Sequence, residues 1–339
     1  MTVRHSRGQY EVRFTHWSAL AAQLPAHAAI ITDSNVAQVL PRDVAPTLVV
    51  PAGEASKSWE MAGQLLNALV EQGHHRSRAV VAIGGGVIGD LGGFVAGVLL
   101  RGVPFIQVPT SLLAMVDSSV GGKVGVDLPS GKNLAGVFLP PQEVLLPIDA
   151  LDTLPPAEFT NGMAEVIKYG LIGDPDLVSQ LQDRPLTEAA DPRVADVVAR
   201  CIAHKARVVE ADEFETTGLR ATLNCGHTVG HALEHWGEYS RFRHGEAVAI
   251  GMVVETRIAE KLGLASAGLA EQVAELVASH GLPTEIPAEA TFEALLPIMA
   301  RDKKAMGTGL AFSLLEGVGA CKLVTNVEPS AVADVWHRR

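Results

Sequence analysis

The first 150 residues alternate short apolar runs with segments of helical periodicity. The apolar runs show no alternation of polar and apolar positions, so they predict strands buried on both faces, as in a parallel sheet covered by helices. Helical spacing at 58–73 and a small-residue, apolar segment at 87–101 predict two of those helices. The predicted strands are 28–32, 47–51, 79–83 and 104–109.

Beyond residue 150 the pattern changes to helical periodicity, and a β-like run returns only near 312–319. The segment LDTLPP at 151–156 carries two prolines, which interrupt regular structure and indicate a domain boundary. The sequence therefore predicts an α/β domain at 1–152 and an all-α domain at 153–339. The predicted helices of the second domain are 157–173, 193–210, 226–239, 244–262 and 268–280.

Length and charge fit a two-domain protein and argue against one class of partner. A chain of 339 residues exceeds the size of one typical core. Its 27 basic and 38 acidic residues give a net charge of −11, which repels polyanions, so we expect no nucleic-acid partner. Any phosphate-bearing substrate would need a local basic pocket.

Cysteine usage and the N-terminal sequence predict a soluble, cytoplasmic protein. Cys201, Cys225 and Cys321 are widely spaced and form no CxxC pair, which argues against a disulfide framework or a thiolate zinc site. The N-terminus has no apolar core of a signal peptide. The uncharged stretches near 91–100 and 102–116 are shorter than the ~18–20 residues of a membrane span, so we expect no membrane partner.

A glycine-rich turn follows the predicted strand at 79–83. Gly84, Gly86 and Gly89 satisfy the pattern GxGxxG between a strand and a helix, where backbone N–H groups can approach a pyrophosphate. No acidic residue lies about 20 positions further on to bind a ribose. The turn therefore predicts a dinucleotide site that differs from the Rossmann pattern, and a tight turn kept for packing is the alternative.

Histidines cluster in the predicted helices at 226–239 and 244–262. His227, His231 and His235 are spaced i,i+4 on one helix face, and His244 follows shortly after. Imidazoles at this spacing suit Zn²⁺, which commonly takes three protein ligands at a catalytic site. Glu165 is a candidate third ligand, and an i,i+3 salt bridge from Glu165 to Lys168 is the alternative for that residue.

The segment 117–133 is rich in glycine and carries Asp117, Lys123, Lys132 and Asn133. Its composition predicts an irregular, closely packed loop whose two lysines could neutralise a phosphate in an otherwise acidic protein. A solvated glycine-rich loop is the alternative.

These motifs resemble the 3-dehydroquinate synthase family over most of the chain. The resemblance implies an α/β NAD-binding domain followed by a helical domain that binds metal and substrate, in a cytoplasmic homodimer. It also implies a lyase of the shikimate pathway, in aromatic amino acid biosynthesis, with NAD and Zn²⁺ as cofactors and Co²⁺ as a possible substitute. The matching segments are PAGEASKS, GGGVIGDLGGF, LRGVPFIQVPTSLLAMVDSSVGGKVGVDLPSGKN, LDTLP, AEVIKYG, KARVVEADE, GLRATLNCGHTVGHALE, HGEAVAIGM and RDKKAMG.

The resemblance also implies roles for individual residues. Arg101 would reach the phosphate of the substrate in the neighbouring subunit, and Lys304 is an alternative to Lys303. The implied metal ligands are Glu165, His227 and His244. The implied NAD-binding residues are Asp33, Asn35, Glu54, Lys57, Gly85, Gly86, Asp90, Thr110, Ser111, Lys123, Lys132 and Thr153. The implied substrate residues are Asp117, Lys123, Lys132, Asn133, Lys168, Lys205, Arg220, Asn224, His231 and Lys303.

The reaction of the family converts 3-deoxy-D-arabino-heptulosonate 7-phosphate to 3-dehydroquinate and phosphate. It proceeds by transient oxidation with NAD, phosphate elimination, reduction, ring opening and an intramolecular aldol closure. The substrate carries a carboxylate, and an arginine can bind that group by paired hydrogen bonds, which favours Arg220 as its partner. A bridge from Arg220 to Glu213 or Glu215 is the alternative for that side chain.

Two further functions remain open at this stage. One is another enzyme on the same scaffold, either a cyclase for a different sugar phosphate or a metal- and NAD-dependent dehydrogenase of the glycerol type. The other is a non-catalytic NAD-binding protein. The cyclase-like segment 117–133 and Arg220 argue against the dehydrogenase. Every metal and lysine position of the resemblance is filled, which argues against a non-catalytic protein.

Overall fold

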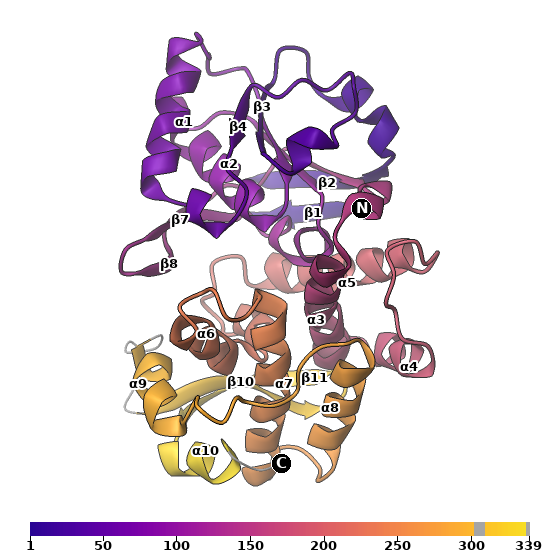
Figure 1. Cartoon of the computed structure of the whole chain (residues 1–339), viewed down its shortest axis with the longest axis vertical. Coiled ribbons are helices and arrows are strands. Elements are labelled where there is room, and N and C mark those ends of the chain that lie inside the picture. Colours follow the sequence, from indigo (N-terminus) through magenta and orange to yellow (C-terminus); the bar gives the residue numbers. More distant parts are fainter. Residues whose placement is uncertain (302–308, 337–339) are drawn as a thin grey trace. The chain divides into compact units, whose positions relative to one another are not determined.

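The computed structural model describes residues 1–301, apart from the side chain of Arg301, and residues 309–336. The chain divides into two compact units. Figure 1 shows the ribbon coloured along the sequence. Unit 1 comprises Met1–Phe159 and Pro192–Ala206, and unit 2 comprises Thr160–Asp191 and Arg207–Arg339. The domain boundary after residue 152 stays a prediction.

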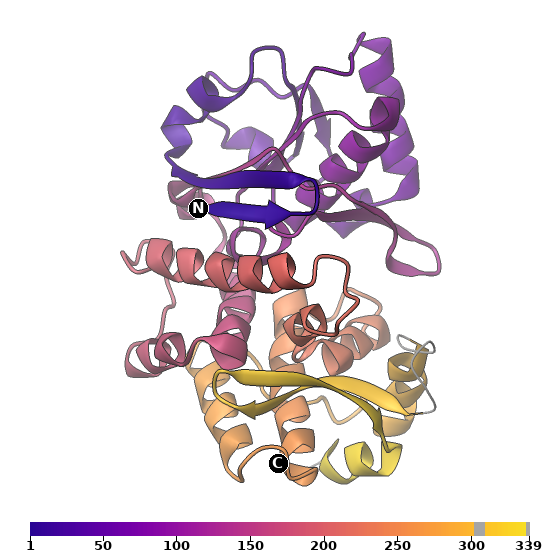
Figure 2. The same cartoon turned by 180° about the vertical axis from the view of Figure 1, so that it is seen from behind.

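Unit 1 contains a mostly parallel sheet. Its strands are β1 (Thr2–His5), β2 (Gly8–Thr15), β3 (Ala29–Asp33), β4 (Leu48–Val50), β5 (Val80–Gly84), β6 (Phe105–Pro109) and β9 (Glu143–Pro147). Their order is β1-β2-β9-β6-β5-β3-β4. Among the described pairings of this sheet, β1 with β2 is the one antiparallel pair, an edge hairpin (Figure 2). The predicted strands correspond to β3, β4, β5 and β6, so the parallel sheet is confirmed.

Both faces of this sheet are covered. On one face lie α1 (Trp59–Glu71) and α2 (Gly86–Val98), whose buried Leu65 and Leu91 belong to the same core as the strands. On the other face, Leu20 packs among apolar residues of β5, β6 and β9. The helix α2 lies very close to the sheet because it presents glycine there. A Cβ added at Gly92 would lie 2.8 Å from the Cβ of Ala82.

The segment 117–133 is not the irregular loop that its glycines predicted. It contributes to an antiparallel hairpin of β7 (Lys123–Leu128) and β8 (Gly131–Phe138), and Val124 of this hairpin packs in the core with α2. A Cβ on Gly125 would lie 2.8 Å from the carbonyl oxygen of Ala135. The prediction was wrong because glycine here brings two strand backbones close together.

The elements after β9 are mostly helical. They are α3 (Pro156–Gly173), α4 (Pro175–Asp183), α5 (Val194–Ala211), α6 (His227–Trp236), α7 (His244–Lys261), α8 (Leu269–Ser279), α9 (Phe292–Arg301), α10 (Pro329–Trp336), β10 (Leu310–Gly317) and β11 (Ala320–Val327). The predicted helices correspond to α3, α5, α6, α7 and α8, so the predicted fold class is confirmed. The β10–β11 hairpin adds two strands to this otherwise helical part (Figure 2). None of the described helices is both long and apolar enough to cross a membrane.

The core of unit 2 forms around α7. Val254 and Ile258 of that helix are fully buried and share one apolar cluster with Phe312 of β10. Trp336 closes the cluster from α10, stacks edge-on against Phe292 with ring centroids 5.6 Å apart, and donates from Nε1 to the carbonyl of Ala290 at 2.9 Å. These contacts hold α7 in the position from which its first residue, His244, reaches the candidate site.

Glycine residues allow the backbones of α6 and α7 to approach each other closely. A Cβ on Gly226 would lie 2.7 Å from the carbonyl oxygen of Val248, and one on Gly230 would lie 3.2 Å from Val248 Cα. A Cβ on Gly251 would overlap the carbonyl oxygen of Gly226. Since backbone atoms cannot rotate out of the way as a flexible side chain can, this contact excludes any larger residue.

We predict that Gly251→Ala lowers the free energy of unfolding by about 1–3 kcal/mol, because the added methyl group overpacks a backbone contact. Gly63→Ala is the matched control. An added Cβ at Gly63 in α1 meets nothing within 4 Å, so this substitution should stabilise the helix by about 0.5–1 kcal/mol. Thermal and urea unfolding of both variants measure the difference. Equal stability of the two variants would contradict the close helix contact.

Candidate functional site

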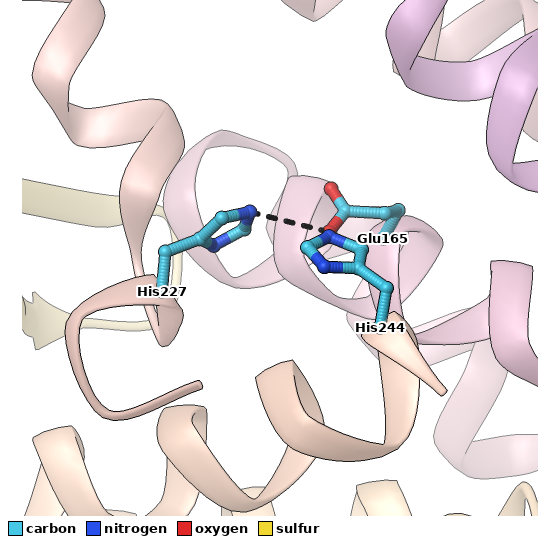
Figure 3. Close-up of side chains that lie close together, drawn as sticks. All are labelled: Glu165, His227 and His244. Atoms are coloured by element: carbon cyan, nitrogen blue, oxygen red, sulfur yellow. Dashed lines mark ion pairs between the residues drawn. The ribbon is translucent and has the colours of Figure 1, made fainter. Parts of the chain in front are cut away.

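Glu165, His227 and His244 come together in unit 2 (Figure 3). Glu165 lies on α3, and the two histidines are the first residues of α6 and α7. Glu165 Oε1 is 3.6 Å from Nε2 of each histidine, and one donor atom from each residue lies within 4.8 Å of the others. A carboxylate and two imidazoles are donors that Zn²⁺ takes in catalytic sites. The three predicted ligands therefore meet, and their binding of an ion stays a prediction.

Lys168 shares this site. It lies i,i+3 from Glu165 and forms an ion pair with Oε2, with both side chains almost wholly buried. The salt bridge considered as an alternative is therefore present. It engages the opposite carboxylate oxygen from the one that faces the histidines, so the ion pair and the histidine cluster coexist. The ammonium of Lys168 also lies 4.8 Å from the ring centroid of Tyr169.

Each histidine has a hydrogen-bond partner on its other ring nitrogen. His227 Nδ1 lies 3.1 Å from the carbonyl oxygen of Cys225, and His244 Nδ1 lies 3.2 Å from Glu234 Oε2. With Nδ1 directed to these acceptors, Nε2 is the ring nitrogen that faces Glu165 in both histidines. Outer contacts of this kind fix which nitrogen can bind a metal.

The two histidines have opposite electrostatic surroundings. Burial, followed by repulsion from Lys168, lowers the pKa of His227 to about 3. Burial also acts to lower the pKa of His244, but the carboxylates of Glu165 and Glu234 beside the ring outweigh burial and raise that pKa to about 10. In the ion-free protein, therefore, one imidazole is neutral and the other is held as a cation between two carboxylates.

Two polar side chains fix the starts of the helices that carry these histidines. Glu255 of α7 is buried, and its carboxylate accepts the N–H of Gly226 at 2.7 Å and the N–H of Val229 at 3.0 Å. The side-chain oxygen of Asn161 on α3 accepts the N–H of Gly245 at 2.6 Å. The N–H groups in the first turn of a helix lack intrahelical partners, so these acceptors stabilise both helix starts.

His231 lies next to the cluster. Its ring centroid is 5.3 Å from that of His227 and 6.2 Å from that of His244, and its side chain is exposed. With Glu234 and His244 it forms a second group whose donor atoms lie within 4.8 Å of one another. His235 continues the row on α6 and lies 5.9 Å from the ring of Tyr239.

Arg220 lies in a loop organised by Asp212. The Asp212 carboxylate accepts N–H groups from Thr216 at 2.8 Å, Thr217 at 3.2 Å and Arg220 at 3.0 Å, which holds the pKa of Asp212 well below its usual range. The side chain of Arg220 is buried and donates from Nη1 to the carbonyl oxygen of Glu213. Asn224 ends the short helix Arg220–Asn224.

In unit 1, the predicted NAD residues follow the carboxyl ends of parallel strands. The strands β3 and β5 are neighbours in the sheet. The chain continues from β3 to β4 on one side of this pair and from β5 to β6 on the other, so a topological switch point lies between β3 and β5. Dinucleotides bind at such points in open α/β sheets. Asp33 ends β3, Glu54 and Lys57 follow β4, Gly85 and Gly86 follow β5, Thr110 and Ser111 follow β6, and Thr153 follows β9.

Local contacts order several of these residues. Asp33 Oδ1 accepts the N–H groups of Asn35 at 2.8 Å and of Val36 at 3.0 Å, which folds the turn after β3. Lys57 Nζ lies 2.6 Å from Asp90 Oδ2. Burial acts to lower the pKa of Lys57, but Asp90 and Glu54 outweigh it and raise that pKa.

The start of α2 is rich in glycine. Gly85 is its N-cap residue and provides no side-chain cap. The Thr110 N–H donates to the carbonyl oxygen of Gly84 at 3.0 Å, and Ser111 Oγ accepts the N–H of Ala114 at 3.3 Å. The strand end, the helix start and the hydroxyl residues after β6 therefore lie in one region of unit 1.

The predicted substrate residues of unit 1 form two groups. Lys205 Nζ donates to Asp117 twice, to the carbonyl oxygen at 2.7 Å and to Oδ1 at 2.8 Å. On the β7–β8 hairpin, Lys132 Nζ lies 3.4 Å from Glu54 Oε1 and the Asn133 N–H donates to Asp127 Oδ1 at 2.7 Å.

The other predicted residues of this part of the chain are Lys123, Arg101 and Thr153. Lys123 begins β7 and is exposed. Leu100 and Arg101 are both exposed and have φ values of 50° and 67°, which is unusual for consecutive non-glycine residues. The Thr153 hydroxyl donates to the carbonyl oxygen of Ala150 at 2.9 Å. Lys303 and Lys304 lie outside the described residues.

Three acidic residues of the site were missed at the sequence level: Asp212, Glu234 and Glu255. Glu234 could have been noticed, because it stands three residues after His231 in GHTVGHALE, on the helix of two predicted site histidines. Glu255 gives no such signal, since it lies 28 positions along the chain from His227 (255 − 227) and meets the start of α6 only through helix packing.

The sheet with its glycine-rich turn, followed by the helical part with its Glu–His–His cluster, gives the chain the fold of the sugar-phosphate cyclases. The structure is similar to 2-epi-5-epi-valiolone synthase from Streptomyces hygroscopicus, solved with NAD⁺ and Zn²⁺ bound, with a TM-score of 0.88 and 25% identity over 96% of this chain and 95% of that one. It is also similar to 2-deoxy-scyllo-inosose synthase complexed with carbaglucose-6-phosphate, NAD⁺ and Co²⁺, with a TM-score of 0.84 and 26% identity over 99% and 98% of the two chains.

Comparison with protein-family models identifies the family within this class. The model of the 3-dehydroquinate synthase N-terminal part matches residues 47–161, and that of the C-terminal part matches residues 162–305. The chain is also 43% identical to the 3-dehydroquinate synthase of Geobacter metallireducens, over 91% of this chain and 88% of the relative. The chain therefore belongs to the 3-dehydroquinate synthase family, as its motifs predicted.

We predict that Glu255→Ala lowers the free energy of unfolding by at least about 1–3 kcal/mol, because it leaves two buried N–H donors at the start of α6 without their acceptor. Glu255→Gln should cost less, since the amide oxygen can still accept one of them. Glu275→Ala, an exposed substitution on α8, is the control and should change stability by less than about 0.5 kcal/mol. Chemical unfolding checks this order, and equal stability of Glu255→Ala and the control would contradict it.

Proposed function

We propose that the protein converts 3-deoxy-D-arabino-heptulosonate 7-phosphate to 3-dehydroquinate and phosphate, as a lyase. The observation that carries this proposal is the meeting of Glu165, His227 and His244 in a chain of this family. Identity supports this substrate over those of related cyclases. It is 43% to a relative named 3-dehydroquinate synthase, and 25–26% to synthases of 2-epi-5-epi-valiolone and 2-deoxy-scyllo-inosose.

The donor set fits a divalent ion. Glu165 supplies one oxygen and each histidine one nitrogen, all close together, with outer hydrogen bonds on both imidazoles. Zn²⁺ and Co²⁺ both accept such donors, and we propose Zn²⁺. A bound ion would polarise a substrate hydroxyl and lower its pKa. The chain itself contributes the buried carboxylate, the orientation of the rings and the neighbouring ammonium of Lys168.

The region at the β3–β5 switch point fits NAD. The uncapped N–H groups at the start of α2 and the glycines around them suit a pyrophosphate. Asp33, Asn35, Glu54, Lys57, Gly85, Gly86, Asp90, Thr110, Ser111, Lys123, Lys132 and Thr153 are the proposed contacts. NAD⁺ would provide a reversible hydride acceptor, so that it is not consumed in the net reaction.

The remaining proposed residues bind and orient the substrate. The backbone N–H of Arg220 donates to the Asp212 carboxylate, and its guanidinium donates to the carbonyl oxygen of Glu213. The guanidinium is therefore fixed before a substrate carboxylate arrives. Such preorganisation reduces the entropy lost on binding. Asp117, Lys123, Lys132, Asn133, Lys168, Lys205, Asn224, His231 and Lys303 complete the proposed substrate set, in which ammonium and amide groups would bind phosphate and hydroxyls.

Three finer points belong to the same proposal. The protein would act in the cytoplasm and as a homodimer, with Arg101 reaching the substrate phosphate of the neighbouring subunit. The exposed side chain of Arg101 and the unusual backbone at Leu100 and Arg101 support this role, because such strain tends to persist at functional positions.

We predict that removing the metal with a chelator abolishes phosphate release, and that added Zn²⁺ or Co²⁺ restores it. His227→Ala should lose more than about 100-fold in activity together with its bound metal, since a ligand is removed outright. His235→Ala is the control on the same helix and should keep both within about twofold, as expected for an exposed side chain. Metal analysis measures the bound metal of each variant, and a phosphate-release assay measures its activity. Full activity of metal-free protein would disprove the assignment.

We predict that Arg220→Ala lowers kcat/KM for the heptulosonate by about 10–100-fold, or ~1.4–2.7 kcal/mol, because the substrate carboxylate loses a paired cation. The exposed Arg207→Ala on α5 controls for loss of a basic residue. The unmodified protein should turn over sedoheptulose 7-phosphate, which has no carboxylate, far more slowly than the heptulosonate. Comparable rates with both sugars, or a kinetically silent Arg220→Ala, would point to another cyclase reaction.

A further inference from the structure

A buried carboxylate outside the proposed ligand set contacts His244. Glu234 Oε2 lies 3.2 Å from His244 Nδ1, while Nε2 of the same ring lies 3.6 Å from Glu165 Oε1. The Glu234 side chain is 4% exposed. The imidazole of His244 is thus held between two carboxylates, one at each nitrogen.

The position of Glu234 is unfavourable for a carboxylate by other criteria. It is in the last turn of α6, where the helix dipole favours cations over anions. Its burial removes the water that would solvate the charge. Because both effects oppose an ionised glutamate here, the contact with His244 contributes to offsetting them.

His227 provides an internal comparison. Its Nδ1 faces the neutral carbonyl oxygen of Cys225 at 3.1 Å, whereas Nδ1 of His244 faces a charged acceptor. A carboxylate on the outer nitrogen orients an imidazole more firmly and makes its inner nitrogen a stronger donor to a metal than a carbonyl does.

From this geometry we propose that Glu234 is a positioning residue for His244, a role that rests on the proposed metal site. It holds the ring so that Nε2 is directed to the position shared with Glu165 and His227. It thereby strengthens binding of one divalent ion. The competing interpretation is that Glu234 is itself a ligand of a second ion together with His231 and His244, whose donor atoms also lie within 4.8 Å of one another.

The test uses the full chain, stripped of metal and titrated with Co²⁺, whose absorption spectrum reports its ligands. Glu234→Gln keeps the size of the side chain and one acceptor oxygen but removes the charge. We expect one Co²⁺ per chain in both proteins, a Co²⁺ affinity about 10–100-fold weaker in the variant, and an altered spectrum. Saturating Co²⁺ should restore much of the lost turnover, whereas a general packing defect would not respond to the ion.

Glu246→Gln is the matched control. Glu246 lies two residues after His244, and its carboxylate contacts Arg243. This variant removes one negative charge near the site without touching the ring, so Co²⁺ affinity should stay within about threefold of the original. The unfolding temperature of each metal-free variant separates altered binding from altered folding.

Three outcomes would overturn the proposal. If Glu234→Gln binds Co²⁺ with unchanged affinity and spectrum, Glu234 does not position His244, and the proposed function stands. If the original protein binds two ions and Glu234→Gln binds one, Glu234 is a ligand of a second site. If the original protein binds no Co²⁺ or Zn²⁺, the metal site of the proposed function fails and the role of Glu234 fails with it.

Discussion

The candidate metal site depends on backbone contacts that only glycine allows. The start of α7 reaches α3 at Gly245, where an added Cβ would overlap the carbonyl oxygen of Asn161, and α7 meets α6 at Gly251 in the same way. These two contacts set the distances among three helices, and each helix carries one proposed ligand. A larger residue at either position would move His244 or His227 away from Glu165, even though neither glycine has a side chain that could touch an ion.

Charge balance is the second constraint on the site. Glu165 is fully buried, and a buried carboxylate is stable only with close positive or hydrogen-bonding partners. Lys168 supplies one partner at Oε2, and the two histidines face Oε1. Burial and Lys168 disfavour a charge on His227, whereas Glu165 and Glu234 favour one on His244. The pKa values of the two imidazoles therefore move in opposite directions. The surroundings, more than the residue type, decide which histidine is charged.

Much of the fold could be predicted because its signals are local. Continuous apolar runs predicted β3, β5 and β6, and i,i+4 histidines predicted one face of α6. The β7–β8 hairpin could not be predicted, since its glycines have the composition of a loop and act only when two backbones meet. The same limit applies to the site. Motifs predicted Glu165, His227 and His244, but Glu255 acts through helix packing, which periodicity does not report.

A pattern among the lysines shows how an acidic protein can prepare sites for anions. Four proposed cofactor or substrate lysines each form an ion pair with another proposed site residue: Lys57 with Asp90, Lys132 with Glu54, Lys168 with Glu165 and Lys205 with Asp117. A lysine free in solution loses about 1.5–2 kcal/mol of rotamer entropy when it is fixed. The carboxylate partner fixes each ammonium in advance, and the same partner keeps a buried lysine charged. In the proposed reaction, an arriving phosphate would therefore meet cations already in position, although the net charge of the protein is negative.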